Sequence, residues 1–475
     1  MQINPNIFRG YDIRGIVNED LNPAVAEAVG GAFGAFLKRR GIERAVVGYD
    51  CRATSPEYSE KIIQGLSWAG VDVINIGLNL VGTFYWAQYH LDCRGGVFVT
   101  ASHNPAEYNG FKLAVDFSET LVSDDIQSLR QMIESDDFVE GKKKGTIREL
   151  NIKESYLQDL LKRVVVQKKF KVVVDAGFAT AGIVMPELLR RAGCEVVEVN
   201  CSVDSSFPLG TPDPIDINVA NRLSVEVVKN KADIGFSYDA DGDRIGVVDD
   251  KGGIIWNDIL VAVFAVDALR QHPGGIIMYN TLCSKVVEDT ILQHKGKPFM
   301  WRTGHSFLKK KNQEIKAVFI GELSGHFFFS ADFYNHDDGA YSTLRLLSYL
   351  SKSKKSLSEI VGELVQYISS PEIKIYCPED KKTDLIKKII PKLKGDFPDG
   401  RIIDDERAGD GVRVDLGDGM FVIRYSQNAP YLTIKFESKT QKNYNRFKNY
   451  LRELLVSFDE IDWDSAINVN TKFLE

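Results

Sequence analysis

A serine at residue 102 follows a short apolar strand and opens a polar loop. The segment reads Val97-Phe-Val-Thr-Ala-Ser-His-Asn-Pro105, in which the proline fixes the turn. A hydroxyl at the carboxyl end of a buried strand lies where open α/β sheets present reactive groups. Taken alone, the pattern has two interpretations. Either Ser102 is a nucleophile, or Ser102 and Asn104 only satisfy backbone groups of the turn.

Three aspartates alternate in a second loop, Asp239-Ala-Asp-Gly-Asp-Arg244, which follows an apolar strand. Because the glycine permits a tight turn, the three carboxylates can converge on one hard cation such as Ca²⁺ or Mg²⁺. Three protein ligands leave coordination positions open, which suits a metal that engages a phosphate oxygen. The alternative is a solvated acidic turn in which Arg244 pairs with the acids; otherwise Arg244 faces a phosphoryl group.

Three similar strand–helix–strand units must position these loops. They are expected at 45–50, 56–69 and 71–76, at 171–175, 182–192 and 195–199, and at 275–279, 284–293 and 298–301. Each spans about thirty residues, the spacing of a parallel βαβ crossover. Each is followed by a further strand that ends in a polar loop, the third being Gly321-Glu-Leu-Ser-Gly-His326. Because strand ends of α/β sheets bind ligands, we expect three similar domains that contribute loops to a common cleft.

From about residue 369 the pattern changes. Strands expected at 372–376, 401–403, 412–416, 420–425 and 432–436, with helices at 381–393 and 441–456, predict an antiparallel α+β domain. The acidic stretch 459–475 has no assignable pattern. The predicted fold class is α/β, with three similar mixed α/β domains at 1–148, 149–252 and 253–368 and a C-terminal α+β domain at 369–475, arranged around a central cleft.

Composition excludes several classes of protein. With 44% hydrophobic residues, 26% charged residues and a formal net charge of -7, the chain is typical of a soluble protein and unlike a nucleic-acid binder. The six cysteines lack CxxC spacing, which indicates reduced thiols. No apolar run is long enough to cross a bilayer, and the start lacks the pattern of a secretory signal. We therefore expect a cytoplasmic protein that binds neither membrane nor nucleic acid.

Four motifs, in this order, resemble those of the α-D-phosphohexomutase superfamily. They are Thr100-Ala-Ser-His-Asn-Pro105, Asp239-x-Asp-Gly-Asp-Arg244, Gly321-Glu-x-Ser-Gly-His326 and Arg424-x-Ser426. The likeness covers essentially the whole chain. It is greatest to the bacterial phosphomannomutase/phosphoglucomutase branch, which shares Phe8-Arg-Gly-Tyr-Asp-Ile-Arg-Gly15 and Thr303-Gly-His-Ser-Phe307. The resemblance implies an isomerase of carbohydrate metabolism.

By this resemblance Ser102 carries a phosphoryl group, and Mg²⁺ is held against it. The implied metal ligands are Ser102, Asp239, Asp241 and Asp243. Charge neutralisation and in-line positioning are what phosphoryl transfer needs most. The phosphoserine donates to a hexose monophosphate, the resulting bisphosphate turns end for end, and its other phosphate returns to Ser102. This implies interconversion of hexose 6-phosphate and hexose 1-phosphate, of mannose and/or glucose, with hexose 1,6-bisphosphate as activator.

The resemblance also implies a substrate site. Glu322 can accept hydrogen bonds from two adjacent ring hydroxyls, and the donors around Arg424 suit a phosphate dianion. His326 either contacts substrate or is a structural histidine. The implied substrate-binding residues are Tyr11, Arg14, Thr303, Gly304, His305, Glu322, Ser324, His326, Arg424, Ser426, Gln427 and Asn428.

The implied catalytic residues are Ser102, His103, Lys112 and Arg244. A proton must leave the attacking hydroxyl, and His103, Lys112 and His305 are candidates to accept it. Lys112 has two interpretations, because burial lowers the pKa of a lysine and makes it a base, whereas nearby phosphates raise it and make it a charge clamp.

One departure from the branch lies in the third repeat. The chain reads Thr281-Leu-Cys-Ser284 where the branch has Val-Lys-Cys-Ser, so Leu282 replaces a substrate-contacting lysine. The positive charge that the third repeat contributes to the substrate site then comes from His305 and Lys285. Leu282 is also the one feature that favours a catalytically weak phosphosugar-binding protein.

A second alternative is a phosphoglucosamine mutase, which typically has glutamine where Leu323 stands. The sequence does not distinguish mannose from glucose, or a monomer from a homodimer. The expected partners are small phosphosugars.

Overall fold

The structure, a computed structural model, describes residues 3–426 and 430–475. The chain folds into two compact units. The first contains the chain up to Asn257 together with Lys309–Glu314 and Ser324–Ile360. The second contains Asp258–Leu308, Ile315–Leu323 and Val361–Glu475. The serine loop and the aspartate loop therefore belong to the same unit.

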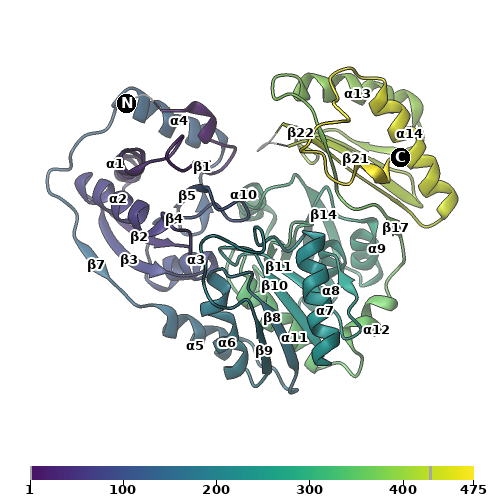
Figure 1. Cartoon of the computed structure of the whole chain (residues 1–475), viewed down its shortest axis with the longest axis horizontal. Coiled ribbons are helices and arrows are strands. Elements are labelled where there is room, and N and C mark those ends of the chain that lie inside the picture. Colours follow the sequence, from purple (N-terminus) through teal and green to yellow (C-terminus); the bar gives the residue numbers. More distant parts are fainter. Residues whose placement is uncertain (1–2, 427–429) are drawn as a thin grey trace. The chain divides into compact units, whose positions relative to one another are not determined.

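The first sheet has the strand order β1-β5-β4-β2-β3-β7, with β6 paired to β5 (Figure 1). Strand β2 pairs in parallel with β3 and β4, which confirms the predicted crossover. The serine loop follows β4, a strand whose residues are all buried. The elements are η1 (Pro5–Ile7), β1 (Ile13–Ile16), α1 (Pro23–Arg39), β2 (Arg44–Tyr49), α2 (Ser55–Trp68), β3 (Asp72–Leu78), α3 (Val81–His90), β4 (Gly95–Val99), β5 (Tyr108–Val115), β6 (Glu119–Thr120), α4 (Ser123–Glu134) and β7 (Ile147–Glu149).

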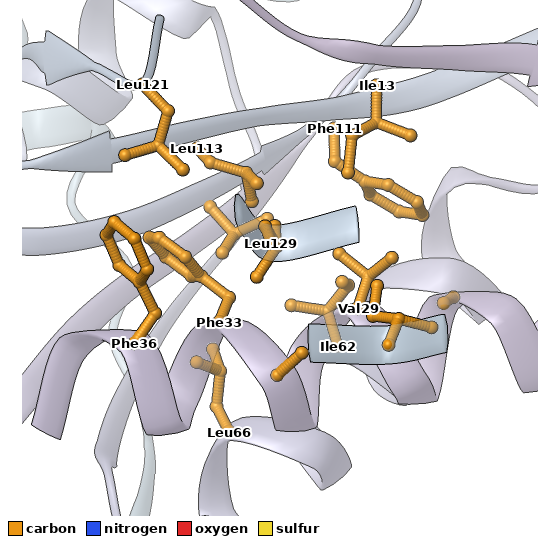
Figure 2. Close-up of a cluster of buried hydrophobic side chains, with 14 of the residues drawn as sticks. Ile13, Val29, Phe33, Phe36, Ile62, Leu66, Phe111, Leu113, Leu121 and Leu129 are labelled. Carbon is orange, nitrogen blue, oxygen red and sulfur yellow. The ribbon is translucent and has the colours of Figure 1, made fainter. Parts of the chain in front are cut away.

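Helices α1 and α2 build the core of this domain with the sheet. Figure 2 shows aromatic and aliphatic side chains of α1 and α2 turned toward those of β1 and β5. The two helices approach closely at Gly65, where a Cβ would lie 2.3 Å from the carbonyl oxygen of Glu27. Only glycine permits this contact. The labelled residues are Ile13, Val29, Phe33, Phe36, Ile62, Leu66, Phe111, Leu113, Leu121 and Leu129.

The second sheet has the order β12-β11-β10-β8-β9. Strand β8 is parallel to β9 and β10, and β10 is antiparallel to β11. The aspartate loop joins β10 to β11, so it begins at the end of a fully buried strand. The elements of this sheet and of the rest of the first unit are α5 (Lys153–Arg163), β8 (Lys171–Asp175), η2 (Thr180–Ile183), α6 (Met185–Arg191), β9 (Glu195–Val199), α7 (Ile217–Asn230), β10 (Ile234–Tyr238), β11 (Ile245–Val248), β12 (Ile254–Ile255), β16 (Phe327–Phe328), α11 (Gly339–Ser351) and α12 (Leu357–Gly362).

In the second unit, β13 lies between β14 and β15 and is parallel to both, which confirms the third crossover. The elements are α8 (Asn257–Gln271), β13 (Ile276–Asn280), α9 (Lys285–Gln293), β14 (Lys297–Trp301), α10 (His305–Ile315) and β15 (Phe319–Gly321). The loops after β14 and β15 hold the residues expected to bind a sugar.

The fourth sheet is antiparallel, in the order β17-β22-β21-β20-β19 with β18 paired to β22, as expected of an α+β domain. The stretch 459–475 runs beside β18, where Lys374 and Val469 exchange two backbone hydrogen bonds of 3.0 and 2.9 Å. Leu474 is fully buried. The elements are β17 (Ile368–Ser369), β18 (Ile373–Tyr376), α13 (Lys382–Asp396), β19 (Arg401–Ile403), β20 (Gly411–Asp415), β21 (Gly419–Tyr425), β22 (Tyr431–Ser438), α14 (Gln441–Val456) and η3 (Thr471–Phe473).

Among residues 3–426 and 430–475, no helix combines the length and apolar character needed to cross a membrane.

Candidate active site

The loop that carries Ser102 is held by the buried guanidinium of Arg52. This group donates hydrogen bonds to the carbonyl oxygens of Ser102 and Asn104, both at 2.6 Å. It also donates to the carbonyl oxygens of Pro105 and Tyr108, at 2.7 and 3.0 Å. Because arginine presents its donors in a rigid fork, these four bonds select one shape for the loop.

The Ser102 hydroxyl is buried between charged groups. Its backbone has a φ of +48°, a left-handed conformation that costs about 1–3 kcal/mol, and Thr100 Oγ1 accepts its N–H at 2.8 Å. Ser102 Oγ donates to Asp239 Oδ2 at 2.8 Å and accepts from Arg244 Nη2 at 3.0 Å. His103 Nδ1 lies 3.2 Å from the same hydroxyl. Since Arg244 Nε also lies 3.2 Å from Asp239, this arginine both pairs with an acid and faces the hydroxyl.

The three aspartates of the loop after β10 converge. Asp239, Asp241 and Asp243 each offer a carboxylate oxygen, these oxygens lie within 4.8 Å of one another, and all three residues are buried. Within the described residues, Oδ1 of Asp241 and Oδ1 of Asp243 accept no hydrogen bond. Hard divalent cations bind carboxylate oxygens of this kind, so the residues present fit Mg²⁺.

Lys112 of β5 lies against two of these carboxylates. Its Nζ donates to Asp241 Oδ2 at 2.9 Å and to Asp243 Oδ2 at 2.6 Å. Burial alone would lower the pKa of Lys112, but the two carboxylates raise it well above its usual range. Burial and the neighbouring carboxylates raise the pKa of Asp239, whereas Lys112 overcomes burial and brings the pKa of Asp241 to about 2. This geometry favours the clamp interpretation of Lys112.

Arg14 of β1 contacts the serine loop. Its Nε donates to Asp12 Oδ2 at 2.7 Å, and its Nη1 donates to Asn104 Oδ1 at 2.7 Å and to the carbonyl oxygen of Ala101 at 3.2 Å. Tyr11 is half-buried just before this strand. The structure therefore brings Arg14, which belongs to the opening segment Phe8–Gly15, onto the loop of Ser102.

In the second unit, Glu322 is held by the loop after β14. The N–H of Gly304 donates to Glu322 Oε1 at 2.9 Å, and Glu322 is 1% exposed. Asn280 links the same loops, because its amide nitrogen donates to Thr303 Oγ1 at 3.2 Å and its oxygen accepts the N–H of Leu323 at 3.1 Å. The carboxylate of Glu322 is thus held in one orientation by the loop after β14.

The other residues of these motifs are divided between the units. His305 is buried at the start of α10 in the second unit. Ser324 is half-buried and belongs with His326 to the first unit. The backbone of His326 forms a bridge with Arg244, and its Nδ1 lies 3.7 Å from Asp243 Oδ1. His326 is therefore next to the aspartate cluster.

Leu282, the residue that departs from the branch pattern, is 4% exposed and packs against Met420 and Val422 of β21. Lys285 is buried as well, and its Nζ lies 3.8 Å from Glu288 Oε2. The ammonium group of Lys285 therefore lies near a carboxylate of its own helix, α9.

Arg424 is oriented by Asp410 at the end of β21. Its Nε donates to Asp410 Oδ1 at 2.8 Å, and its Nη2 pairs with the other carboxylate oxygen. The carbonyl oxygen of buried Ser426 accepts a hydrogen bond from Lys382. Arginine and hydroxyl donors held in this way suit a phosphate group. Gln427 and Asn428 lie outside the described residues.

Sequence reasoning missed several residues that shape the site, among them Arg52, Asp50 and Asp410. Asp50 accepts hydrogen bonds from Thr100 Oγ1 at 2.8 Å and from Ser55 Oγ at 2.7 Å. The one signal available for Asp50 and Arg52 is their position after β2, beside the parallel strand that ends at the serine loop.

Comparisons with known proteins show which proteins the chain resembles. Three protein-family models match: "Phosphoglucomutase/phosphomannomutase, alpha/beta/alpha" domain I at 5–140, domain II at 154–253 and domain III at 256–368. A phosphomannomutase/phosphoglucomutase of Pseudomonas aeruginosa is 37% identical over 96% of each chain. A phosphoglucomutase of Neisseria gonorrhoeae is 35% identical over 97% of this chain and 99% of that protein. A solved phosphoglucomutase/phosphomannomutase family protein from Burkholderia thailandensis has a TM-score of 0.88 and 32% identity, covering 96% of this chain and 98% of that one.

Proposed function

Since this chain belongs to the phosphoglucomutase/phosphomannomutase family of the α-D-phosphohexomutases, we propose that it interconverts the 6-phosphates and 1-phosphates of mannose, glucose or both. The reaction is an intramolecular phosphoryl transfer through a phosphoserine enzyme and a hexose bisphosphate. The observation that carries the proposal is the buried Ser102 hydroxyl, 2.8 Å from Asp239 and 3.0 Å from Arg244 beside the aspartate cluster.

Ser102 is the phosphoryl carrier in this proposal. The loop held by Arg52 fixes the direction in which the phosphoryl group on Ser102 points. The Arg244 guanidinium, which lies 3.0 Å from the Ser102 hydroxyl, donates hydrogen bonds to the phosphoryl oxygens. Asp239, Asp241, Asp243 and the phosphoserine would hold Mg²⁺, which would supply positive charge next to the transferred phosphoryl group.

The transfer step exchanges one P–O bond for another. The bond between Ser102 Oγ and phosphorus breaks and a bond from a sugar hydroxyl oxygen to phosphorus forms. The sugar hydroxyl loses its proton, and Ser102 Oγ takes one up to become a hydroxyl again. We propose that His103, whose Nδ1 lies 3.2 Å from Ser102 Oγ, exchanges a proton with this oxygen as the P–O bond breaks or forms. Lys112 keeps its own proton, because its ammonium donates to two carboxylates, and acts as a clamp.

The substrate must be held in two orientations, because each end of the sugar meets Ser102 in turn. Glu322 accepts hydrogen bonds from two adjacent ring hydroxyls, which remain next to each other in both orientations. Arg424, oriented by Asp410, and Ser426 bind the phosphate that does not react. Small phosphosugars are the substrates, a hexose 1,6-bisphosphate is the activator, and the cytoplasm is the place of action.

A coupled assay tests the proposal. Purified protein with Mg²⁺ and glucose 1,6-bisphosphate is given the 1-phosphate of mannose, glucose or glucosamine, and we expect turnover of the mannose or glucose compound. Ser102→Ala should lose turnover and should not gain the mass of a phosphoryl group from the bisphosphate. Ser59→Ala is the control, because Ser59 is a buried serine of α2 outside the site. Ordinary turnover by Ser102→Ala would refute the carrier assignment, and turnover of glucosamine 1-phosphate alone would favour the phosphoglucosamine mutase alternative.

A further inference from the structure

His326 and Asp337 form a buried pair beside the aspartate cluster of the first unit. Nδ1 of His326 lies 2.6 Å from Asp337 Oδ2, and the two side chains are 9% and 0% exposed. The backbone of His326 is tied to the aspartate loop by its bridge with Arg244. The ring is therefore fixed from two directions, by the loop through its backbone and by Asp337 through Nδ1.

Asp337 is itself held by the start of helix α11. The next residue, Asp338, caps that helix, since its carboxylate accepts the N–H of Tyr341 at 2.8 Å. The hydroxyl of Tyr156 donates to both oxygens of the same carboxylate, at 2.9 and 2.8 Å. A cap with these contacts fixes the backbone on which Asp337 stands.

Lys309 supplies positive charge on the other side of Asp337. Its Nζ lies 3.7 Å from Asp337 Oδ1 and 4.0 Å from the centre of the Tyr85 ring, and its side chain is 0% exposed. Burial lowers the pKa of Lys309 to about 8, against the opposing effect of Asp337. A buried carboxylate needs such compensation, because an unpaired one costs several kcal/mol. Asp337 therefore lies between two basic groups, Lys309 and His326.

We propose that Asp337 is a positioning residue that acts on the reaction through His326, an inference that rests on the proposed mutase function. The 2.6 Å contact between His326 Nδ1 and Asp337 Oδ2, in a buried pair, holds the imidazole ring against this carboxylate. Asp337 thereby sets the orientation of the ring, and Nε2 is the nitrogen with which His326 meets the substrate. Lys309, 3.7 Å from Asp337 Oδ1, compensates the charge of this buried carboxylate.

A second divalent cation is the competing explanation for the same carboxylates. Asp243, His326 and Asp337 each offer one ligand atom, and these atoms lie within 4.8 Å of one another. However, His326 Nδ1 and Asp337 Oδ2 lie 2.6 Å apart, closer than two ligand atoms of one divalent cation usually lie, so the observations favour positioning.

Asp337→Asn tests the proposal, because asparagine removes the charge and keeps the shape. We expect kcat to fall by about 10- to 100-fold, as for other residues that orient a functional histidine. KM and the Mg²⁺ concentration for half-maximal activity should change by less than about twofold. Asp338→Asn is the matched control, since asparagine is also a good helix cap, and it should keep kcat within about twofold of the wild-type value.

A double-mutant cycle separates positioning from a general loss of structure. In a His326→Gln background, Asp337→Asn should cause no further loss of kcat, because the residue through which it acts is gone. A further loss by the same factor would overturn the proposal. A large shift in the Mg²⁺ requirement would also overturn it and would indicate a cation site instead.

If Asp337→Asn does not fold, as judged by thermal melting, the double variant with Lys309→Met replaces it. That variant removes both buried charges and should show the same loss of kcat; an unchanged kcat would overturn the proposal. Failure of the proposed function is a separate result, since the wild-type protein itself would then turn over no hexose phosphate.

Discussion

Replacement of Arg52 by lysine tests how strongly the shape of the serine loop controls phosphoryl transfer. Arg52 donates to four carbonyl oxygens of that loop, and lysine has all its donors on one nitrogen. A hydrogen bond from a charged group contributes about 1.5–3 kcal/mol. If lysine keeps two of the four bonds, the loop loses about 3–6 kcal/mol of hydrogen bonding. Part of this energy is recovered when water binds the carbonyl oxygens that lysine leaves without a partner. We therefore expect the free energy of unfolding to fall by about 1–3 kcal/mol.

The larger effect of Arg52→Lys should be on chemistry, because a displacement of about 1 Å in a reacting group costs about 100-fold in rate. The assay is the rate at which Ser102 takes a phosphoryl group from glucose 1,6-bisphosphate, followed by the mass of the intact protein. Arg222→Lys is the control, since Arg222 pairs with one carboxylate, that of Asp175, through a 2.6 Å contact that an ammonium can keep. A rate for Arg52→Lys within about twofold of the wild-type rate, despite lowered stability, would refute the reasoning.

Two further predictions concern the metal and pH. Asp241→Asn should abolish activation by Mg²⁺, because it removes one of three converging carboxylates. The measurement is a Mg²⁺ titration of activity after chelation, with thermal melting to show that the fold is kept. An unchanged response to Mg²⁺ would contradict the assignment of the aspartate cluster as a metal site. Burial lowers the pKa of His336 from 6.5 to about 4. As pH falls, this histidine is therefore protonated in the unfolded chain before it is protonated in the folded protein, and stability is lost between about pH 6.5 and pH 4. His336→Phe should remove this loss. Between pH 7 and pH 5, urea unfolding should show that the free energy of unfolding falls by about 2 kcal/mol less in the variant than in the wild-type protein. An equal fall in both proteins would count against a buried neutral histidine.

The strand–helix–strand units were predictable because each strand is a short apolar run and each helix has one apolar face. Strands β8, β9 and β19 begin and end at the predicted residues. The helix expected at 182–192 is instead η2 followed by α6. Pro186 lies in the first turn of α6, where its missing N–H is tolerated, and the chain starts a new helix there.

The candidate site was predictable where its residues lie in contiguous motifs. Arg52, Asp337 and Asp410 lie outside those motifs, and isolated charged residues are mostly exposed in proteins. Their roles depend on partners far along the chain: Arg52 contacts carbonyl groups 50 to 56 residues away. Only the folded structure brings such pairs together, which is why the sequence did not single them out.

The pairing of the stretch 459–475 with β18 has a consequence for association with other chains. Edge strands with unsatisfied backbone groups recruit foreign strands and promote aggregation. Here the N–H and C=O of Lys374 are bonded to Val469, and the C=O of Tyr376 accepts the N–H of Asp462. This border of the C-terminal sheet is thereby protected against strand addition by residues 459–475 of the same chain.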